Sequence, residues 1–179
     1  ASNNSSVVAQ SFASVTDGAG PAVIAAETED EDADGLIDIV YVTMSEAIDG
    51  TTLATGAGAA SDFENIDDAT DGAVFGSYAI TGASTTNAFL GDGANDEYVA
   101  VSITENTIAT LADYDTEVTL DIDLKLGNIE DLAASNNSSV VAQSFASVTD
   151  GAGPAVIAAE TEDEDADGLI DIVYVTMSE

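Results

Sequence analysis

The sequence predicts an all-β protein, built as an antiparallel β-sandwich that repeats along the chain. Short runs rich in Val, Ile, Thr, Tyr and Phe alternate with acidic or glycine-rich turns, which is typical of strands. No stretch combines a long 3.6-residue apolar period with end caps, as an amphipathic helix would. Residues 1–46 recur without a single change as residues 134–179, a period of 133 residues. A period of that length corresponds to one whole domain rather than to one turn of a solenoid.

The domain boundary is predicted from the segment Thr-Asp-Gly-Ala-Gly-Pro, which occurs at 16–21 and again at 149–154. Two glycines and a proline end any strand, and these two segments contain the only prolines of the chain. We therefore expect three segments, arranged like beads on a string. They are residues 1–20 as the C-terminal strand region of a preceding repeat, 21–153 as a complete repeat, and 154–179 as the N-terminal strands of the next repeat.

The predicted strands are Ala22–Thr28, Leu36–Ser45, Val74–Ile80, Tyr98–Thr104, Glu117–Leu126 and Val140–Val148. In the fifth, apolar and polar residues alternate from Val118 to Leu126, the two-residue period of a strand with one solvent-facing side. In the second, Ile37 is out of phase with Val40 and Val42, which suggests a β-bulge near Asp38. Six or seven strands in about 130 residues fit an antiparallel β-sandwich.

Two segments are interpreted as insertions into this framework. Thr52–Ala60 is a run of small residues, and Asp62–Gly72 carries several acidic side chains among few apolar ones. Segments of this kind would lengthen the loops of a sandwich, and we expect contacts between neighbouring filaments there.

The composition is strongly acidic, with 35 Asp and Glu residues, a single basic residue, Lys125, and a net charge of −34. Such a chain repels itself unless cations screen it or bind to it. Nucleic acid and anionic membranes are therefore not expected as partners. Because 45% of the residues are apolar, the chain can still bury a core, and we expect a folded domain. The acid-coated surface of a halophilic protein is an alternative explanation of the charge.

The residue types that most enzymes use are missing. The chain has no Cys and no His and only one Lys, which excludes disulfides, zinc thiolate sites and the common nucleophile–base pairs. Carboxylate pairs remain, but abundant acids supply these by chance. We therefore expect no enzymatic activity and no catalytic residues.

The strongest site motif is D-x-D-x-D-G-x-x-D over residues 30–38, repeated over 163–171. Carboxylates at positions 1, 3 and 5 of such a loop converge because the glycine at position 6 permits a sharp turn, and oxygens at positions 7 and 9 add to the shell. Oxygen ligands without nitrogen or sulfur favour Ca²⁺. The predicted metal ligands are Asp30, Asp32, Asp34, Leu36 through its carbonyl, and Asp38, with Asp163, Asp165, Asp167, Leu169 and Asp171 in the second copy.

The motif departs from an EF-hand at position 12, where Tyr41 replaces the bidentate glutamate. The loop therefore joins two strands, and water or another acid must complete the shell. The candidates for that acid are Glu27, Glu29 and the turn Asp92–Glu97. The loop lies about ten residues past the Gly-Pro junction, so calcium is expected to stiffen the joint between domains. The alternative interpretation is an acidic turn without a metal.

The order Gly-Pro-Ala-Val-Ile, then Glu-Asp-Ala-Asp-Gly-Leu-Ile-Asp-Ile-Val-Tyr-Val-Thr-Met-Ser-Glu, closing with Thr-Asp-Gly-Ala-Gly-Pro, resembles bacterial and archaeal Ig-like tandem repeats. These repeats occur in giant cell-surface proteins and adhesins. The resemblance implies an Ig-like sandwich, an extracellular or cell-surface location, calcium in the first inter-strand loop and no enzymatic activity.

The expected function is that of a structural repeat unit in an extracellular filament or stalk, assembled head to tail from adjacent identical repeats and rigidified by calcium. The alternative is an adhesin module that binds a glycan or another surface ligand. Two further points stay open. Residues 1–20 or 154–179 either donate strands to a neighbour or belong to self-contained domains, and the sequons at Asn3, Asn4, Asn136 and Asn137 are either glycan acceptors or polar turns.

Overall fold

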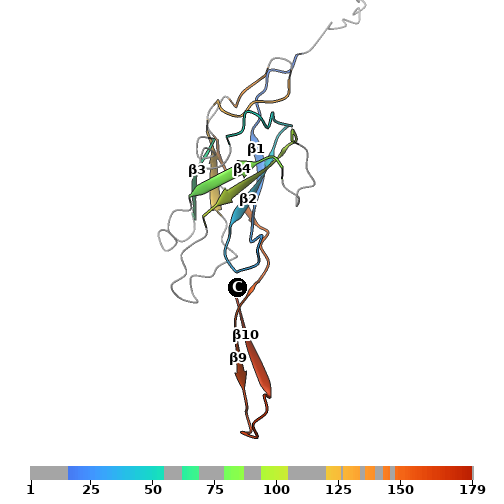
Figure 1. The fold of residues 1–179 in the computed structure, drawn as a ribbon. Helices are drawn as coiled ribbons and strands as arrows, with labels where there is room; N and C mark the ends of the chain where they lie inside the picture. The colour runs from blue at the N-terminus through green and yellow to red at the C-terminus, as the bar shows by residue number, and fades with distance from the viewer. Residues whose placement is uncertain are drawn as a thin grey trace, which may run out of the picture.

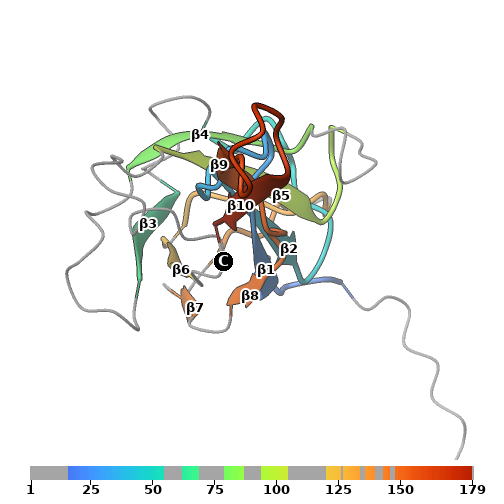
Figure 2. The ribbon, with the colours of Figure 1, turned by 90° about the horizontal axis from the view of Figure 1, so that it is seen from below.

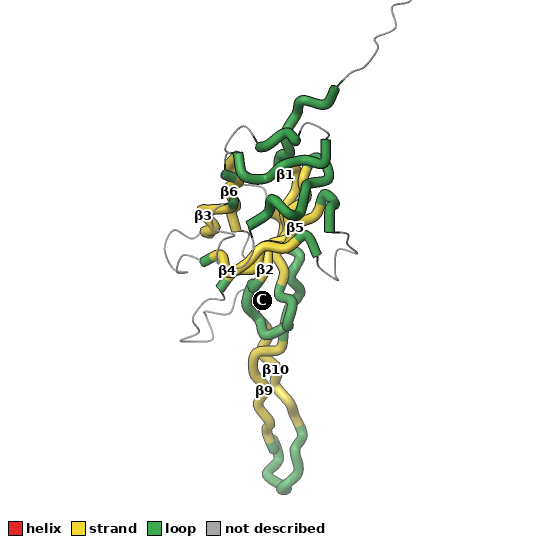
Figure 3. The backbone as a smooth tube through the Cα atoms, turned by 45° about the horizontal axis from the view of Figure 1, so that its top comes forward, coloured by secondary structure: helices red, strands yellow, loops and turns green. Residues whose placement is uncertain are grey.

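The computed structural model describes residues 16–54, 62–68, 79–86, 94–104, 120–125, 127–133, 136–139, 143–145 and 148–178. These residues form ten β-strands and no helix, which confirms the predicted all-β class (Figure 3). Strands β1 to β8 lie between residues 21 and 153 and form one body. The last two strands form a hairpin that extends from one end of this body (Figure 1).

The larger sheet has five strands in the order β4-β5-β2-β1-β8. They are β1 (Val23–Glu29), β2 (Ile39–Met44), β4 (Ile80–Ser84), β5 (Tyr98–Ile103) and β8 (Val148–Asp150). Neighbours are antiparallel except β1 and β8, which run parallel with Ala26 opposite Val148. The prediction of a purely antiparallel arrangement is therefore wrong at this edge, because the chain reaches β8 from the second sheet and then runs alongside β1.

The smaller sheet has the order β3-β6-β7, with β3 (Phe63–Asp68), β6 (Leu120–Leu124) and β7 (Gln143–Phe145), all antiparallel. Strand β3 falls in the segment interpreted above as an acidic insertion, so that interpretation is wrong for residues 63–68. The acidic residues of this segment are typical of a loop, which is why the sequence did not predict a strand here. In the strand they place Glu64 opposite Asp123 across the β3–β6 pair, where like charges are unfavourable. The only basic residue, Lys125, offsets this repulsion with an ion pair of 3.1 Å to Glu64.

The two sheets lie beside each other in the body (Figure 2), and one cluster of buried apolar side chains joins them. It includes Val40 and Val42 of β2, Phe63 of β3 and Ile122 of β6. A second, smaller cluster of Ile39, Tyr41 and Ala100 covers the opposite face of β2 and β5. Strand β2 is thus buried on both faces from Ile39 to Val42, which explains the continuous apolar run there.

Several predicted strand limits need correction. Strand β2 begins at Ile39, so the buried Ile37 belongs to the preceding loop, and the register shift lies at the other end of the β1–β2 pair rather than near Asp38. The single strand expected over 140–148 is two short strands, β7 and β8. The strand expected over 74–80 lies mostly outside the described residues, and β4 starts at its last residue, Ile80.

The terminal hairpin consists of β9 (Val156–Glu162) and β10 (Ile172–Met177), which have the same sequences as β1 and β2. The two pairs share one register, since Ala159 faces Val175 as Ala26 faces Val42, with a register shift at the same place. Burial differs completely: Val40 is 0% exposed, and its counterpart Val173 is 59% exposed. The chain therefore shows the same hairpin once inside a core and once without one.

Candidate metal centre

The acidic loop at residues 30–38 joins β1 to β2 and is shaped by its own carboxylates. The Asp30 carboxylate accepts hydrogen bonds from the Asp34 amide (3.1 Å) and the Gly35 amide (2.7 Å). The Asp34 carboxylate accepts one from the Leu36 amide (3.0 Å). The backbone turns through positive φ at Gly35 (97°), as the motif predicts, and also at Ala33 (60°), where a side chain makes that conformation uncommon. The loop thus turns sharply enough to bring its acids together.

The two copies of the loop gather two overlapping sets of carboxylates. In the first, oxygens of Asp30, Asp32 and Asp34 lie within 4.8 Å of one another. In the second, the group is Asp163, Asp165 and Asp171, which are the counterparts of Asp30, Asp32 and Asp38. The two copies together bring in all four motif positions predicted to supply carboxylates. Either group can hold a metal ion, and the donor set of carboxylate oxygens fits a hard cation.

The predicted carboxylates outside each triad accept backbone hydrogen bonds. The Asp38 carboxylate accepts from the Glu31 amide (3.1 Å), and the Asp167 carboxylate accepts from the Leu169 amide (2.8 Å). Asp171, the counterpart of Asp38, accepts the same hydrogen bond from the Glu164 amide (3.0 Å), and it also belongs to the triad of the second loop. A backbone hydrogen bond at the ninth position is therefore compatible with a place in the carboxylate group.

The crowding of acids in the first loop raises pKa values. The pKa of Asp34 lies above its usual value because of desolvation and the neighbouring charges of Asp32 and Asp30. Desolvation also raises the pKa of Asp38 to about 6, with a further contribution from nearby carboxylates, although the Glu31 amide opposes the shift. The loop therefore carries unfavourable negative charge that a cation would neutralise.

The raised pKa of Asp38 predicts how stability depends on pH without metal. An unfolded aspartate titrates near 3.9, and the folded-state pKa is about 6, so the folded protein binds this proton more tightly. Stability from Asp38 is then fully present below about pH 4 and is lost as the pH rises through about 6. We expect Asp38→Asn to flatten the fall of the melting temperature over this range, measured calorimetrically in chelator. The control is Asp171→Asn in the exposed copy, and equal pH profiles of wild type and Asp38→Asn would contradict the assignment.

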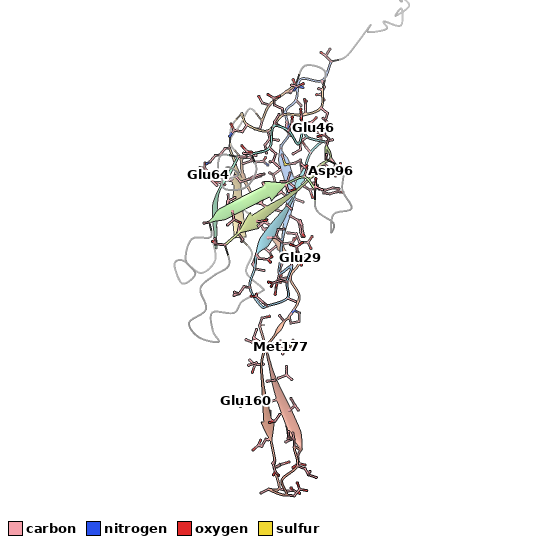
Figure 4. All side chains as sticks on the ribbon, viewed as in Figure 1. Glu29, Glu46, Glu64, Asp96, Glu160 and Met177 are labelled. Carbon is pink, nitrogen blue, oxygen red and sulfur yellow. The ribbon has the colours of Figure 1, made fainter. Side chains whose placement is uncertain are left out.

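The structure distinguishes between the acids considered for completing the shell. Of the turn Asp92–Glu97 the structure describes residues 94–97, and the Asp96 and Glu97 carbonyls accept the Ile48 and Met44 amides, which places these residues at the end of β2 away from the loop. Glu29 is the last residue of β1 and directly precedes Asp30, so it lies at the loop; desolvation raises its pKa, and the charges of Glu27, Asp150, Asp30 and Asp38 raise it further. Figure 4 shows Glu29 and Asp96 at different levels of the body.

The structure also brings together three acids that the sequence analysis missed. Oxygens of Asp17, Glu46 and Asp131 lie within 4.8 Å of one another, at the end of the body where the chain enters β1. Asp131 is 1% exposed and accepts hydrogen bonds from the Asn137 amide (2.8 Å), the Asn137 side chain (2.7 Å) and the Ala133 amide (3.0 Å). No motif could reveal this group, since its members come from three distant parts of the sequence.

The described pair of sequon asparagines takes part in turn contacts. The Asn136 side chain donates to the Glu130 carboxylate (2.8 Å), and the Asn137 side chain donates to Asp131. Both contacts agree with the interpretation as polar turns. Asn3 and Asn4 lie outside the described residues.

Among the described residues, no helix is long and apolar enough to span a membrane. Comparison of the chain with known protein families, with curated proteins and with solved structures finds no match.

Proposed function

We propose that this chain is a structural repeat unit of an extracellular filament or stalk, assembled head to tail with identical repeats. The observation that carries the proposal is the second copy of the first hairpin. Strands β9 and β10 have the register of β1 and β2, yet Val156, Val173 and Val175 are exposed where their counterparts are buried. In the first copy, the residues that cover the hairpin β1–β2 belong to the segment 47–153. A segment of the same sequence after residue 179 would cover the hairpin β9–β10 and complete a second unit.

The domain class in this proposal is an Ig-like β-sandwich. Two sheets of five and three strands share one apolar core, and the parallel β1–β8 pair lies at one edge. Such a unit places its first and last strands side by side, so the Thr149–Pro154 segment leaves from the sheet that contains β1. This arrangement supports a linear array of units.

Calcium is the proposed cofactor, held by Asp30, Asp32, Asp34 and Asp38 with the Leu36 carbonyl, and by the same residues of each further repeat. The carboxylate triads and the raised pKa values support a divalent cation at this loop. The position of the loop decides which joint calcium would stiffen. Strand β1 runs from the incoming junction at Pro21 to the loop, and the outgoing junction passes near the loop, since the Gly151 amide donates to the Thr28 carbonyl. The loop therefore lies nearer the joint with the following unit than the joint with the preceding one.

An adhesin module is the second candidate, and one surface feature favours it. A hollow of about 370 Å³ is lined by residues with hydroxyl or amide side chains, namely Thr51, Ser84, Thr85, Thr86 and Asn95, together with Gly50, Leu53 and Ala94. None of these lining residues is charged, although 20% of the residues of the chain are. A reproducible hit on a glycan array that is lost in Ser84→Ala would favour the adhesin function.

Small-angle X-ray scattering on chains of two, three and four repeats tests the filament function. We expect the maximum dimension in calcium to increase by a constant increment with each added repeat, because each unit would bury its core alone and contact only its neighbours. The control is the same series in chelator, where looser joints should give smaller increments. A maximum dimension that grows far more slowly than the number of repeats would contradict the proposal, since the units would then pack into a compact particle.

A further inference from the structure

The junction segment Thr-Asp-Gly-Ala-Gly-Pro is seen twice, once where the chain enters the body (16–21) and once where it leaves (149–154). The two copies are identical in sequence but differ in their contacts. Each therefore shows how one side of a joint between repeats is held.

The outgoing copy is held by the body it leaves. Thr149 and Asp150 pair with Glu27 and Thr28 of β1, and the Gly151 amide donates to the Thr28 carbonyl (3.1 Å). A Cβ at Gly151 would run into the Glu27 side chain. Ala152 is 7% exposed and belongs to the core. The body thus holds the first four residues of the junction.

The incoming copy is held by the body it enters, through its last residues. A Cβ at Gly20 would overlap the Ser138 carbonyl oxygen, and Pro21 is buried. The next residue, Ala22, donates to the Ser45 hydroxyl (3.1 Å) and accepts from the Ser45 amide (2.7 Å). In this copy the first glycine, Gly18, has nothing near its Cβ position.

The contacts of the two copies are complementary. Gly153, the counterpart of Gly20, has nothing near its Cβ position, and Pro154 is exposed where Pro21 is buried. Ala155 nevertheless already makes the contacts of Ala22, since its amide donates to the Ser178 hydroxyl (3.0 Å) and its carbonyl accepts the Ser178 amide (2.9 Å). The free half of this junction, from Gly153 onward, is thus ready to contact a following unit. The counterpart of Ser138 in that unit would lie against Gly153 as Ser138 lies against Gly20.

We propose that Thr149–Ala155 is a two-sided joint whose free half docks onto a second copy of the 133-residue unit and holds consecutive units in one orientation. The inference rests on the proposed tandem arrangement. The preceding unit holds the junction through Ala152, and the following unit holds it from Gly153 onward. No free linker residue is left between them, and adjacent Cα atoms are only about 3.8 Å apart. Two units this close together would collide in most relative orientations. The joint is therefore stiffer than the flexible connection expected for beads on a string.

A matched pair of glycine substitutions tests the docking contact in the present chain. We expect Gly20→Ala to lower the melting temperature by several degrees, because the added methyl group meets the Ser138 backbone, and Gly153→Ala to leave it unchanged. In a two-unit chain, made by continuing this chain after Glu179 with the sequence of residues 47–153, Gly153→Ala should destabilise the second unit as Gly20→Ala does the first. A neutral Gly20→Ala, or a Gly153→Ala that stays neutral in the two-unit chain, would overturn the docking contact.

Orientation is tested in the same two-unit chain by pulsed electron paramagnetic resonance. The chain has no Cys, so Thr81→Cys in β4, at an exposed position, and the same change in the added unit give two unique spin labels. We expect one narrow distance distribution, which roughly doubles in width when Gly-Ser-Gly-Ser is inserted between Ala152 and Gly153. Equal, broad distributions with and without the insertion would overturn the fixed joint.

Hydrogen exchange of the Val173 and Val175 amides separates this inference from the proposed function. Protection of both amides in the two-unit chain, together with a broad distance distribution, would overturn only the fixed joint. Exposed amides would show that the added segment does not complete the hairpin, which would overturn the tandem unit itself.

Discussion

Replacing Ile37 by alanine is expected to lower the free energy of unfolding by about 3 kcal/mol, whereas the same change at Ile170 should alter it by less than about 0.5 kcal/mol. The two isoleucines occupy the same place in identical sequences. Ile37 is 1% exposed and lies in the core cluster, while Ile170 is 66% exposed on the terminal hairpin. Truncation of a buried isoleucine loses transfer free energy and leaves a cavity, and neither cost applies to an exposed one.

Thermal and urea unfolding of the two variants provides the measurement. For a domain of this size, the loss at Ile37 corresponds to a drop of roughly 10 °C in melting temperature. Because sequence context is identical, differences in β-propensity and in the unfolded chain cancel between the two variants. Equal losses would mean that the terminal hairpin is also covered, either by exchange with β1–β2 or by a second molecule.

Calcium at about 10 mM is expected to raise the melting temperature by roughly 5–10 °C. Extracellular calcium sites have dissociation constants of about 10⁻⁴–10⁻³ M, so mass action adds on the order of 1.5–3 kcal/mol for one site. Neutralising the crowded acids of the first loop provides that stabilisation, since desolvation and neighbouring carboxylates raise the pKa values of Asp34 and Asp38. The gain should disappear in the double variant Asp30→Asn, Asp34→Asn.

The second loop supplies the matched control. Asp163→Asn with Asp167→Asn changes the same two positions in the exposed hairpin, which lies outside the cooperative core, and should leave the calcium response of the melting temperature intact. Sodium chloride is varied separately, because general screening would stabilise any chain of charge −34. A response to molar sodium chloride but not to millimolar calcium would assign the charge to halophilic solvation and leave the loop an acidic turn.

The sequence predicted best those features that depend on neighbouring residues. Strands β1, β2 and β5 were located within a few residues, because their β-branched and aromatic runs end at clear turns. The glycine turn of the loop was also predicted, and Gly35 and Gly168 both adopt positive φ. Strand β3 was missed because its acids resemble a loop, and its pairing with β6 becomes favourable only beside the buried Phe63 and the Lys125–Glu64 ion pair.

The repeat separates the two levels of information directly. Both copies of the hairpin share their register, their positive-φ residues and the hydrogen bonds that the Asp30 or Asp163 carboxylate accepts from the loop backbone. The sequence by itself determined these features, since turn geometry and local hydrogen bonds involve residues a few positions apart. Only the tertiary structure decided which copy is buried, the parallel β1–β8 pair and the grouping of Asp17, Glu46 and Asp131. Burial and pairing of this kind need residues far away in the chain, as in the contact between the Val23 amide and the Gln143 side chain, 120 positions apart.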